Sequence, residues 1–131
     1  MTSAGPATTG PDTATPHAVE VVRRYVIELY NHGNVSLVDE ICADPMARHS
    51  SDGVINLSRA EQTDRITKDL AANSPQFTIV SLFGDDTHAC LTWNAERRST
   101  GETLCGIEIF EVHDGIITDV WNSNYFKGTW K

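Results

Sequence analysis

The sequence of 131 residues has no long apolar run and no paired cysteines. No segment approaches the roughly 18 apolar residues that a membrane helix needs. The opening stretch "MTSAGPATTGPDTATP" lacks the basic region and the apolar segment of a secretory signal. Cys42, Cys90 and Cys105 lie far apart without a CxxC pair, which indicates reduced thiols. We therefore expect a cytoplasmic protein with no membrane partner.

Basic residues are also scarce, and the formal net charge is -8. Phosphate backbones and anionic membranes repel such a surface, so binding to nucleic acid would need a local basic patch. A basic pair, Arg97 and Arg98, lies next to an expected turn, where arginines are usually solvated. We expect no nucleic-acid partner.

The sequence has no glycine-rich phosphate loop and no cluster of metal ligands. Its histidines are scattered through the chain: His17, His32, His49, His88 and His113. A zinc site needs histidine and cysteine side chains at close spacing. We therefore expect neither a metal nor an organic cofactor.

What is present is the composition of one globular domain, with 40% hydrophobic and 21% charged residues. The Thr, Pro, Gly and Ala content of residues 1–15 cannot bury a core, which predicts a disordered tail. Residues 16–131 are then expected to form a single domain.

Three helices are expected in the first part of this domain. Thr15 and Pro16 suit the start of a helix that ends at Gly33. A second, shorter helix is expected in "SLVDEICAD", ending before a proline. The third, in "LSRAEQTDRITKDLAANSP", begins with a capping-box pattern formed by Ser58 and Glu61.

From residue 76 onward the hydrophobic period changes from helical spacing to two. Four strands are expected, in "FTIVSLF", "THACLTWNAERRS", "ETLCGIEIFEVH" and "IITDVWNSNYF". Turns at Thr100-Gly101 and Asp114-Gly115 would join the last three strands as hairpins. Helices followed by an antiparallel meander predict an α+β fold, in which three N-terminal helices pack on a curved, cone-like sheet.

The stretch "GIEIFEVHDGIITDVW" resembles the SnoaL-like branch of the NTF2-like superfamily. Members commonly read G-[I/M]-[D/E]-I-F-R-x-x-D-G-K-I-x-E-H-W at this point. The stretch "VVRRYVIELYNHGNVSLVDEICADP" is similar to the first two helices of the family, and "NYFKGTW" resembles the D-x-F-x-G-T that follows the last strand in a polyketide cyclase of this family. The superfamily contains cyclases, isomerases, dehydratases, hydrolases and non-catalytic binders.

The faces of the strands depend on the two turns. Pairing about Thr100-Gly101 would place Trp93 opposite Glu108 and Leu91 opposite Phe110. At Asp114-Gly115, a two-residue turn would place Asp119 and Trp121 on the Glu108 face. A three-residue loop with a glycine bulge would instead place Val120 and Asn122 there.

The resemblance favours the second arrangement and implies a pocket at these positions. In cyclases that resemble this protein, an aspartate at the position of Asn122 is the general acid/base. An amide cannot exchange a proton near neutral pH, so Glu108 is left as the candidate proton-transfer group. Burial would raise its pKa toward neutrality, and Asn122 could orient a carbonyl or stabilise an enolate.

Other side chains complete the candidate site. His49 is expected in a loop, and the resemblance implies that a side chain at this point reaches the cavity mouth, where His49 could assist proton transfer. Asp119 is the competing acid. Apolar binding surfaces are expected from Trp93, Phe110, Val120, Tyr25 and Tyr30. Trp121 and Ile117 are assigned to the outer face of the sheet, which relatives commonly use to form a homodimer.

Three functions are compatible with these observations. The first is a small cofactor-independent cyclase or isomerase, which moves a proton on a hydrophobic, carbonyl-bearing, polyketide-like intermediate. The second is a non-catalytic binding protein for an apolar small molecule. The third is an epoxide hydrolase-like enzyme, which would need an Asp/Arg/Asp set to activate water.

Overall fold

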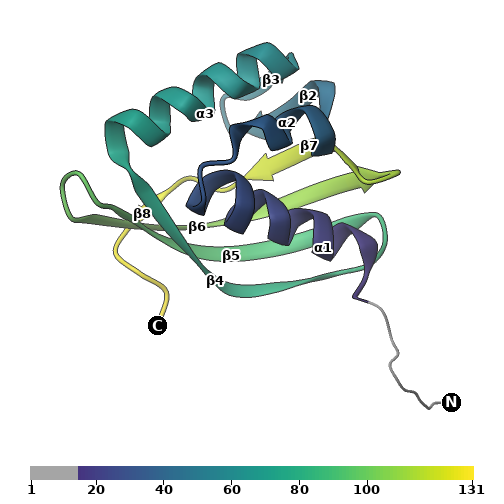
Figure 1. Ribbon diagram of the computed structural model, residues 1–131. Helices are drawn as coiled ribbons and strands as arrows, with labels where there is room; N and C mark the ends of the chain where they lie inside the picture. Colours follow the sequence, from purple (N-terminus) through teal and green to yellow (C-terminus); the bar gives the residue numbers. More distant parts are fainter. Residues whose placement is uncertain (1–14) are drawn as a thin grey trace, which may run out of the picture.

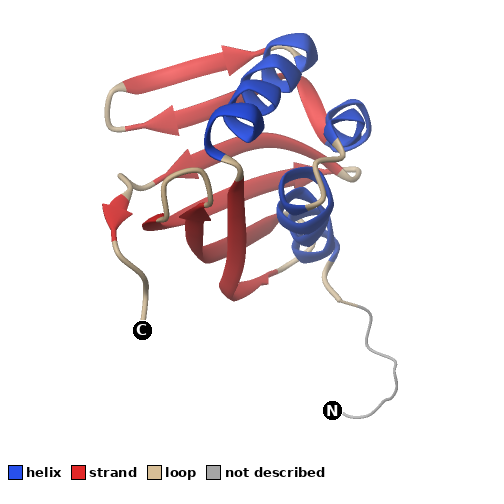
Figure 2. Ribbon diagram, turned by 60° about the vertical axis from the view of Figure 1, so that its left-hand side comes forward, coloured by secondary structure: helices blue, strands red, loops and turns tan. Residues whose placement is uncertain are grey.

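The computed structural model describes residues 15–131, so the predicted disordered tail lies outside the described residues except for Thr15. The helices lie together on one face of a curved sheet (Figure 1, Figure 2). The helical segments are α1 (His17–Arg24), the π-helical continuation η2 (Tyr25–Asn31), the 3-10 turn η3 (Val35–Leu37), α2 (Val38–Ile41) and α3 (Arg59–Asn73). No helix within residues 15–131 is both long and apolar enough to cross a membrane.

Within residues 15–131 the sheet has seven strands, three more than the sequence predicts. They are β2 (Cys42–Ser50), β3 (Gly53–Leu57), β4 (Pro75–Gly84), β5 (His88–Arg97), β6 (Glu102–His113), β7 (Ile116–Asn122) and β8 (Phe126–Lys127). Their order is β3-β2-β7-β6-β5-β4, and β8 pairs with β6. Because β2 runs parallel to β7, the sheet is mixed rather than antiparallel as predicted.

The unpredicted hairpin of β2 and β3 replaces an expected loop. The second helix ends at Ile41 rather than extending to Asp44, because the chain becomes extended at Cys42. Pro45 falls where the pairing between β2 and β7 is irregular, so its missing N–H costs no regular ladder bond.

The predicted start of α3 is confirmed. The Ser58 hydroxyl accepts a hydrogen bond from the backbone N–H of Glu61 at 3.1 Å, and the Glu61 carboxylate accepts one from the Ser58 N–H at 2.9 Å. The start of α1 differs from the prediction. Pro16, and not Thr15, is its N-cap residue, and it makes no side-chain capping bond.

The π-helical segment η2 determines where two tyrosines point. In a regular α-helix, residues five apart face different sides, whereas the i→i+5 pattern of a π-helix brings them to one face. The rings of Tyr25 and Tyr30 accordingly lie 5.4 Å apart, and both face the sheet. This segment therefore directs two phenol groups toward the same space.

The β5–β6 register differs from the prediction by two residues. Arg97 pairs with Glu102, so four residues, 98–101, form the turn instead of two. Glu108 consequently lies opposite Leu91, not Trp93, and Phe110 lies opposite Ala89. An even slip leaves each side chain on its predicted face.

The β6–β7 register places Val120 and Asn122 on the Glu108 face, which is the arrangement that the resemblance favoured. The turn, however, is not the three-residue loop expected for that arrangement. Asp114 and Gly115 have φ angles of 52° and 78° and form a two-residue turn between paired His113 and Ile116. A bulge at Thr118 then shifts the alternation of β7.

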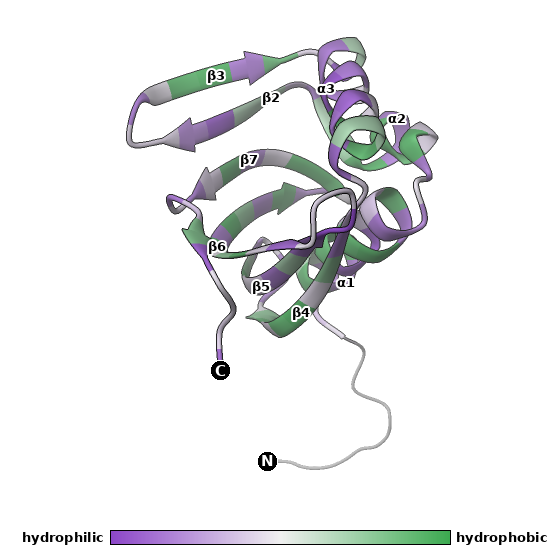
Figure 3. Ribbon diagram, turned by 90° about the vertical axis from the view of Figure 1, so that its left-hand side faces the viewer, coloured by the Kyte–Doolittle hydropathy of each residue, from purple (hydrophilic) through white to green (hydrophobic). Residues whose placement is uncertain are grey.

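The bulge has two consequences for the faces of β7. Glu108 pairs with Asn122 and Phe110 pairs with Val120, as expected for the inner face. Ile117, assigned to the outer face, is instead fully buried in the core, because the alternation reverses between it and Trp121. Figure 3 shows the alternation of hydrophobic and hydrophilic segments along the strands.

Candidate functional site

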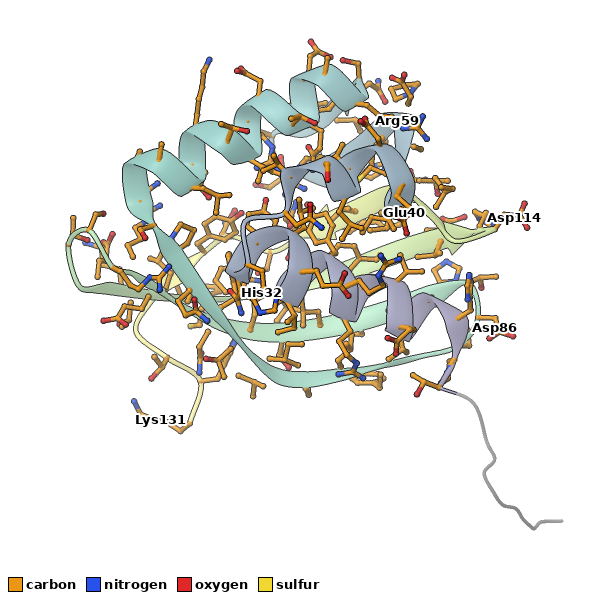
Figure 4. All side chains as sticks on the ribbon, in the orientation of Figure 1. His32, Glu40, Arg59, Asp86, Asp114 and Lys131 are labelled. Atoms are coloured by element: carbon orange, nitrogen blue, oxygen red, sulfur yellow. The ribbon has the colours of Figure 1, made fainter. Side chains whose placement is uncertain are left out.

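A pocket lies between the helices and the inner face of the sheet, and encloses about 680 Å³ including its open mouth. Side chains from η2, α3 and five strands or loops converge on it. The polar and charged members are Tyr25, Tyr30, Arg48, Arg65, Asp69, Arg97, Glu108 and Tyr125. The apolar members are Val26, Pro75, Phe77, Leu91, Trp93, Ala95 and Leu104. Figure 4 shows the side chains that fill the space between the helices and the sheet.

Glu108 lies in this pocket, as the sequence predicted. Only 12% of its side chain is exposed, and a carboxylate oxygen lies 3.7 Å from Nη2 of Arg48. Burial raises the pKa of the Glu108 carboxyl, and the positive charges of Arg48 and Arg65 oppose this increase only in part. The group therefore holds its proton more strongly than an exposed glutamate does.

Asn122 joins Glu108 to Arg48. With the amide oriented to satisfy both neighbours, its Nδ2 donates to the Glu108 carboxylate and its Oδ1 accepts from Nη2 of Arg48 at 2.9 Å. The NH2 group expected to bind a carbonyl or an enolate is thus engaged with Glu108. Asn122 thus contacts both the Glu108 carboxylate and the Arg48 guanidinium.

Arg48 is a site residue that the sequence reasoning missed. It lies on β2 opposite Val120 of β7, and only 14% of its side chain is exposed. Its Nη1 is buried without a hydrogen-bond partner among residues 15–131. The sequence predicts a loop here, because Met46, Arg48 and Ser50 share no apolar pattern that would indicate a strand.

His49, in contrast, points away from the pocket. A loop was expected here, with His49 at the cavity mouth. The segment is strand β2, and adjacent residues of a strand face opposite sides, so His49 faces away from the side of Arg48. Its Nε2 lies 2.9 Å from Asp119, and its ring stacks on Trp121 with a centroid distance of 4.5 Å. Hydrogen bonding to His49 lowers the pKa of Asp119, so this acid stays ionised outside the pocket.

The second cation of the pocket, Arg65, comes from α3. Its Nη2 donates to the hydroxyl of Tyr30 at 3.3 Å, and its Nε donates to Oε1 of Gln62 at 3.3 Å. Gln62 is fully buried and donates to the hydroxyl of Tyr25 at 3.1 Å. Burial raises the pKa of Tyr25 well above its usual value, so this phenol remains neutral.

Aromatic rings form the apolar wall. Phe77 packs edge-on against Trp93 at 5.4 Å and against Tyr30 at 5.2 Å, and Tyr125 packs edge-on against Trp93 at 5.3 Å. The predicted placement of Trp93, Tyr25 and Tyr30 in the pocket wall is confirmed.

Two predicted binding residues lie elsewhere. Phe110 and Val120 face inward as expected, but both are fully buried in the core and do not line the pocket. The Phe110 ring lies 5.5 Å from that of Tyr25 and supports it from behind. Within residues 15–131, no three His, Cys, Asp or Glu side chains gather as a metal site.

A family model described as a SnoaL-like domain matches residues 22–120. The chain belongs to the SnoaL-like family. This confirms the resemblance seen in "GIEIFEVHDGIITDVW". No curated protein sequence matches the chain at a significant level.

Solved structures share the fold of this SnoaL-like chain. A "putative ketosteroid isomerase" from Kribbella flavida is 18% identical, with a TM-score of 0.72, and the match covers 88% of this chain and 82% of that one. A "putative polyketide cyclase" from Acidithiobacillus ferrooxidans is 20% identical, with a TM-score of 0.68 and coverage of 84% and 89%. An NTF2-like protein of unknown function from Mesorhizobium loti is 15% identical, with a TM-score of 0.70 and coverage of 86% and 94%.

The raised pKa of Glu108 predicts how the stability of the SnoaL-like domain depends on pH. The folded state binds the Glu108 proton more tightly than the unfolded state, so this group's contribution to stability is lost as pH rises from the unfolded to the folded pKa. Glu108→Gln remains neutral throughout. We expect the stability of the variant relative to wild type to increase across this pH range in urea denaturation; a relative decrease would contradict the burial argument.

Proposed function

We propose that this SnoaL-like protein is a cofactor-independent isomerase or cyclase, in which Glu108 transfers a proton on a hydrophobic, carbonyl-bearing, polyketide-like substrate. The observation that carries the proposal is a buried carboxyl with a raised pKa, inside an aromatic pocket and within 4 Å of a guanidinium group. A carboxyl with these surroundings is suited to general acid/base catalysis.

The ionised Glu108 would remove a proton from the carbon next to the substrate carbonyl. As that C–H bond breaks, its electron pair moves to form an enolate. The Arg48 guanidinium, next to Glu108, would stabilise the negative oxygen. Glu108 then returns its proton to another carbon in an isomerase. In a cyclase, the enolate carbon forms a bond to a second carbonyl, and the resulting alkoxide takes the proton.

A binding protein without catalysis is the second candidate. It is favoured by Asn122, an amide at the position where related cyclases have an acid. An epoxide hydrolase-like set would need two acids around an arginine, but Arg48 contacts one carboxylate, Glu108, and one amide, Asn122.

Exchange of α-protons separates the two candidates without knowledge of the natural substrate. 2-Tetralone is a flat, apolar ketone whose α-protons exchange with D2O through an enolate, which proton NMR can follow. The proposed enzyme accelerates this exchange over buffer. If the protein binds 2-tetralone but leaves the exchange rate at the buffer value, the binding protein is the better account.

We also propose that the protein forms a homodimer through the outer face of the sheet. One cross-strand row on this face contains exposed apolar side chains from four strands: Val54 of β3, Trp121 of β7, Ile109 of β6 and Phe83 of β4. A self-complementary apolar face of this kind suits a twofold interface.

The three free thiols fit a reducing compartment such as the cytoplasm.

Light scattering after size-exclusion chromatography tests the dimer. We expect a mass twice the 14.4 kDa of one chain, and a shift to the monomer mass in Ile109→Asp. Ile55→Asp is the matched control, because Ile55 is also exposed but belongs to the Arg48 face. A monomeric wild type, or an Ile109→Asp variant that remains dimeric, would exclude this interface.

A further inference from the structure

The cationic groups of the pocket are not matched by its acids. Arg48 has Glu108 within 4 Å, but among residues 15–131 no carboxylate oxygen lies within 4 Å of Arg65. The other charged members of the wall are already engaged: Arg97 with Glu102 at 2.8 Å, and Asp69 with the Asn73 amide at 2.6 Å. Arg65 therefore has only neutral hydrogen-bond partners.

Arg65 is held in place from one side. Gln62 accepts from its Nε and Nη2, both at 3.3 Å, and Tyr30 accepts from Nη2. No residue within 15–131 forms a hydrogen bond with its Nη1. Because Gln62 is itself buried and bonded to Tyr25, the guanidinium is fixed in the pocket wall before any ligand arrives.

Two partly desolvated guanidinium groups in one pocket are unfavourable unless an anion lies near them. Arg48 and Arg65 carry like charges in the same pocket, and burial makes Glu108, the carboxyl next to Arg48, harder to ionise. A protein with a net charge of -8 otherwise repels anions, so a cationic pocket is a specific feature. Arginine is well suited to a carboxylate, which it can bind through two parallel hydrogen bonds.

We propose that Arg65 binds a carboxylate of the substrate, which makes the substrate an aromatic or apolar ring acid with its reacting carbonyl at the Arg48–Glu108 end of the pocket. The ring would lie against Trp93 and Phe77, which are the large apolar surfaces of the wall. The substrate class rests on the proposed proton-transfer function, whereas the carboxylate site itself does not.

Two probes of equal shape test the carboxylate site. 2-Naphthoate and 2-naphthamide share a ring system and differ in charge, and their affinities can be measured by isothermal titration calorimetry. We expect the wild type to prefer the carboxylate by at least about tenfold, as a hydrogen bond to a charged group implies. Arg65→Met should lower naphthoate affinity by a similar factor and leave naphthamide affinity unchanged.

The controls separate charge from folding. Arg65→Lys keeps the charge and should retain part of the preference. Arg23→Met removes an exposed arginine of α1, 46% accessible, and should change neither affinity. Circular dichroism melting identifies any variant that fails to fold. Equal wild-type affinity for the two probes, no measurable binding of either, or a preference that survives in folded Arg65→Met would overturn the inference.

The exchange of 2-tetralone distinguishes the two proposals. If exchange depends on Glu108 but the carboxylate preference is absent, the substrate-acid inference alone fails. If Arg65 confers the preference but Glu108→Gln exchanges 2-tetralone like wild type, the proton-transfer proposal alone fails.

Discussion

Glu108→Gln lowers the rate of α-proton exchange by a factor of about 10²–10⁴, the usual contribution of a general acid or base. Glutamine keeps the shape and the contact with Asn122 but cannot accept a proton. Binding of 2-tetralone should therefore remain close to wild type, because only the proton acceptor is removed. NMR exchange rates and calorimetric affinities, measured on the same samples, give the two quantities.

Asp119→Asn is the matched control for this experiment. Asp119 is the acid that competed with Glu108 in the sequence, and it lies on the outer face of the sheet beside His49. Its loss should leave the exchange rate unchanged. If Asp119→Asn abolishes exchange while Glu108→Gln does not, the assignment of the acid/base group is wrong.

Arg48→Met reduces exchange by about 10²–10³, the cost of removing one donor to a developing oxyanion. It also shifts the pH dependence. The positive charge of Arg48 lowers the pKa of Glu108, so removing that charge raises the pKa further above its usual value. Because the base must be ionised, the rising limb of the rate–pH profile moves to higher pH.

Arg48→Lys separates the two effects. It retains the positive charge, so the rising limb should move less than in Arg48→Met, although the planar guanidinium is lost. Exchange rates measured across the pH range for both variants test this. A rising limb that moves to lower pH in Arg48→Met would contradict the electrostatic role of Arg48.

The parts of the fold that follow local rules could be predicted from the sequence. The capping box at Ser58 and the full extent of β6 depend on neighbouring residues, and both match the structure. Glu108 lies in the pocket because it is on the inward face of β6. This placement was predicted correctly although the predicted β5–β6 register is wrong by two residues. An even slip does not exchange the faces of a strand.

The β2–β3 hairpin depends on contacts distant in the chain and was missed. Its parallel pairing with β7 joins segments about seventy residues apart, such as His49 and Trp121, and local patterns do not encode such pairings. Pro45 also made the segment resemble a loop. As a result His49 was expected at the pocket and Arg48 was overlooked, although they are adjacent in the chain.

Arg65 was missed for a different reason. A charged residue on an amphipathic helix is usually solvated, and only the position of α3 over the sheet brings this one into the pocket. The bulge at Thr118, which buries Ile117, likewise has no local signal in "IITDVWNSNYF". The acid of the site was therefore predictable from the sequence, whereas its two cations were not.

The most direct test of the account is the pKa of the Glu108 carboxyl in wild-type protein. Carbon-13 NMR titration gives this value, with Glu108→Gln identifying the resonance. We predict a pKa above the usual range of a glutamate, coincident with the rising limb of α-proton exchange. A pKa at or below the usual range would contradict the role of Glu108 as a buried proton-transfer group.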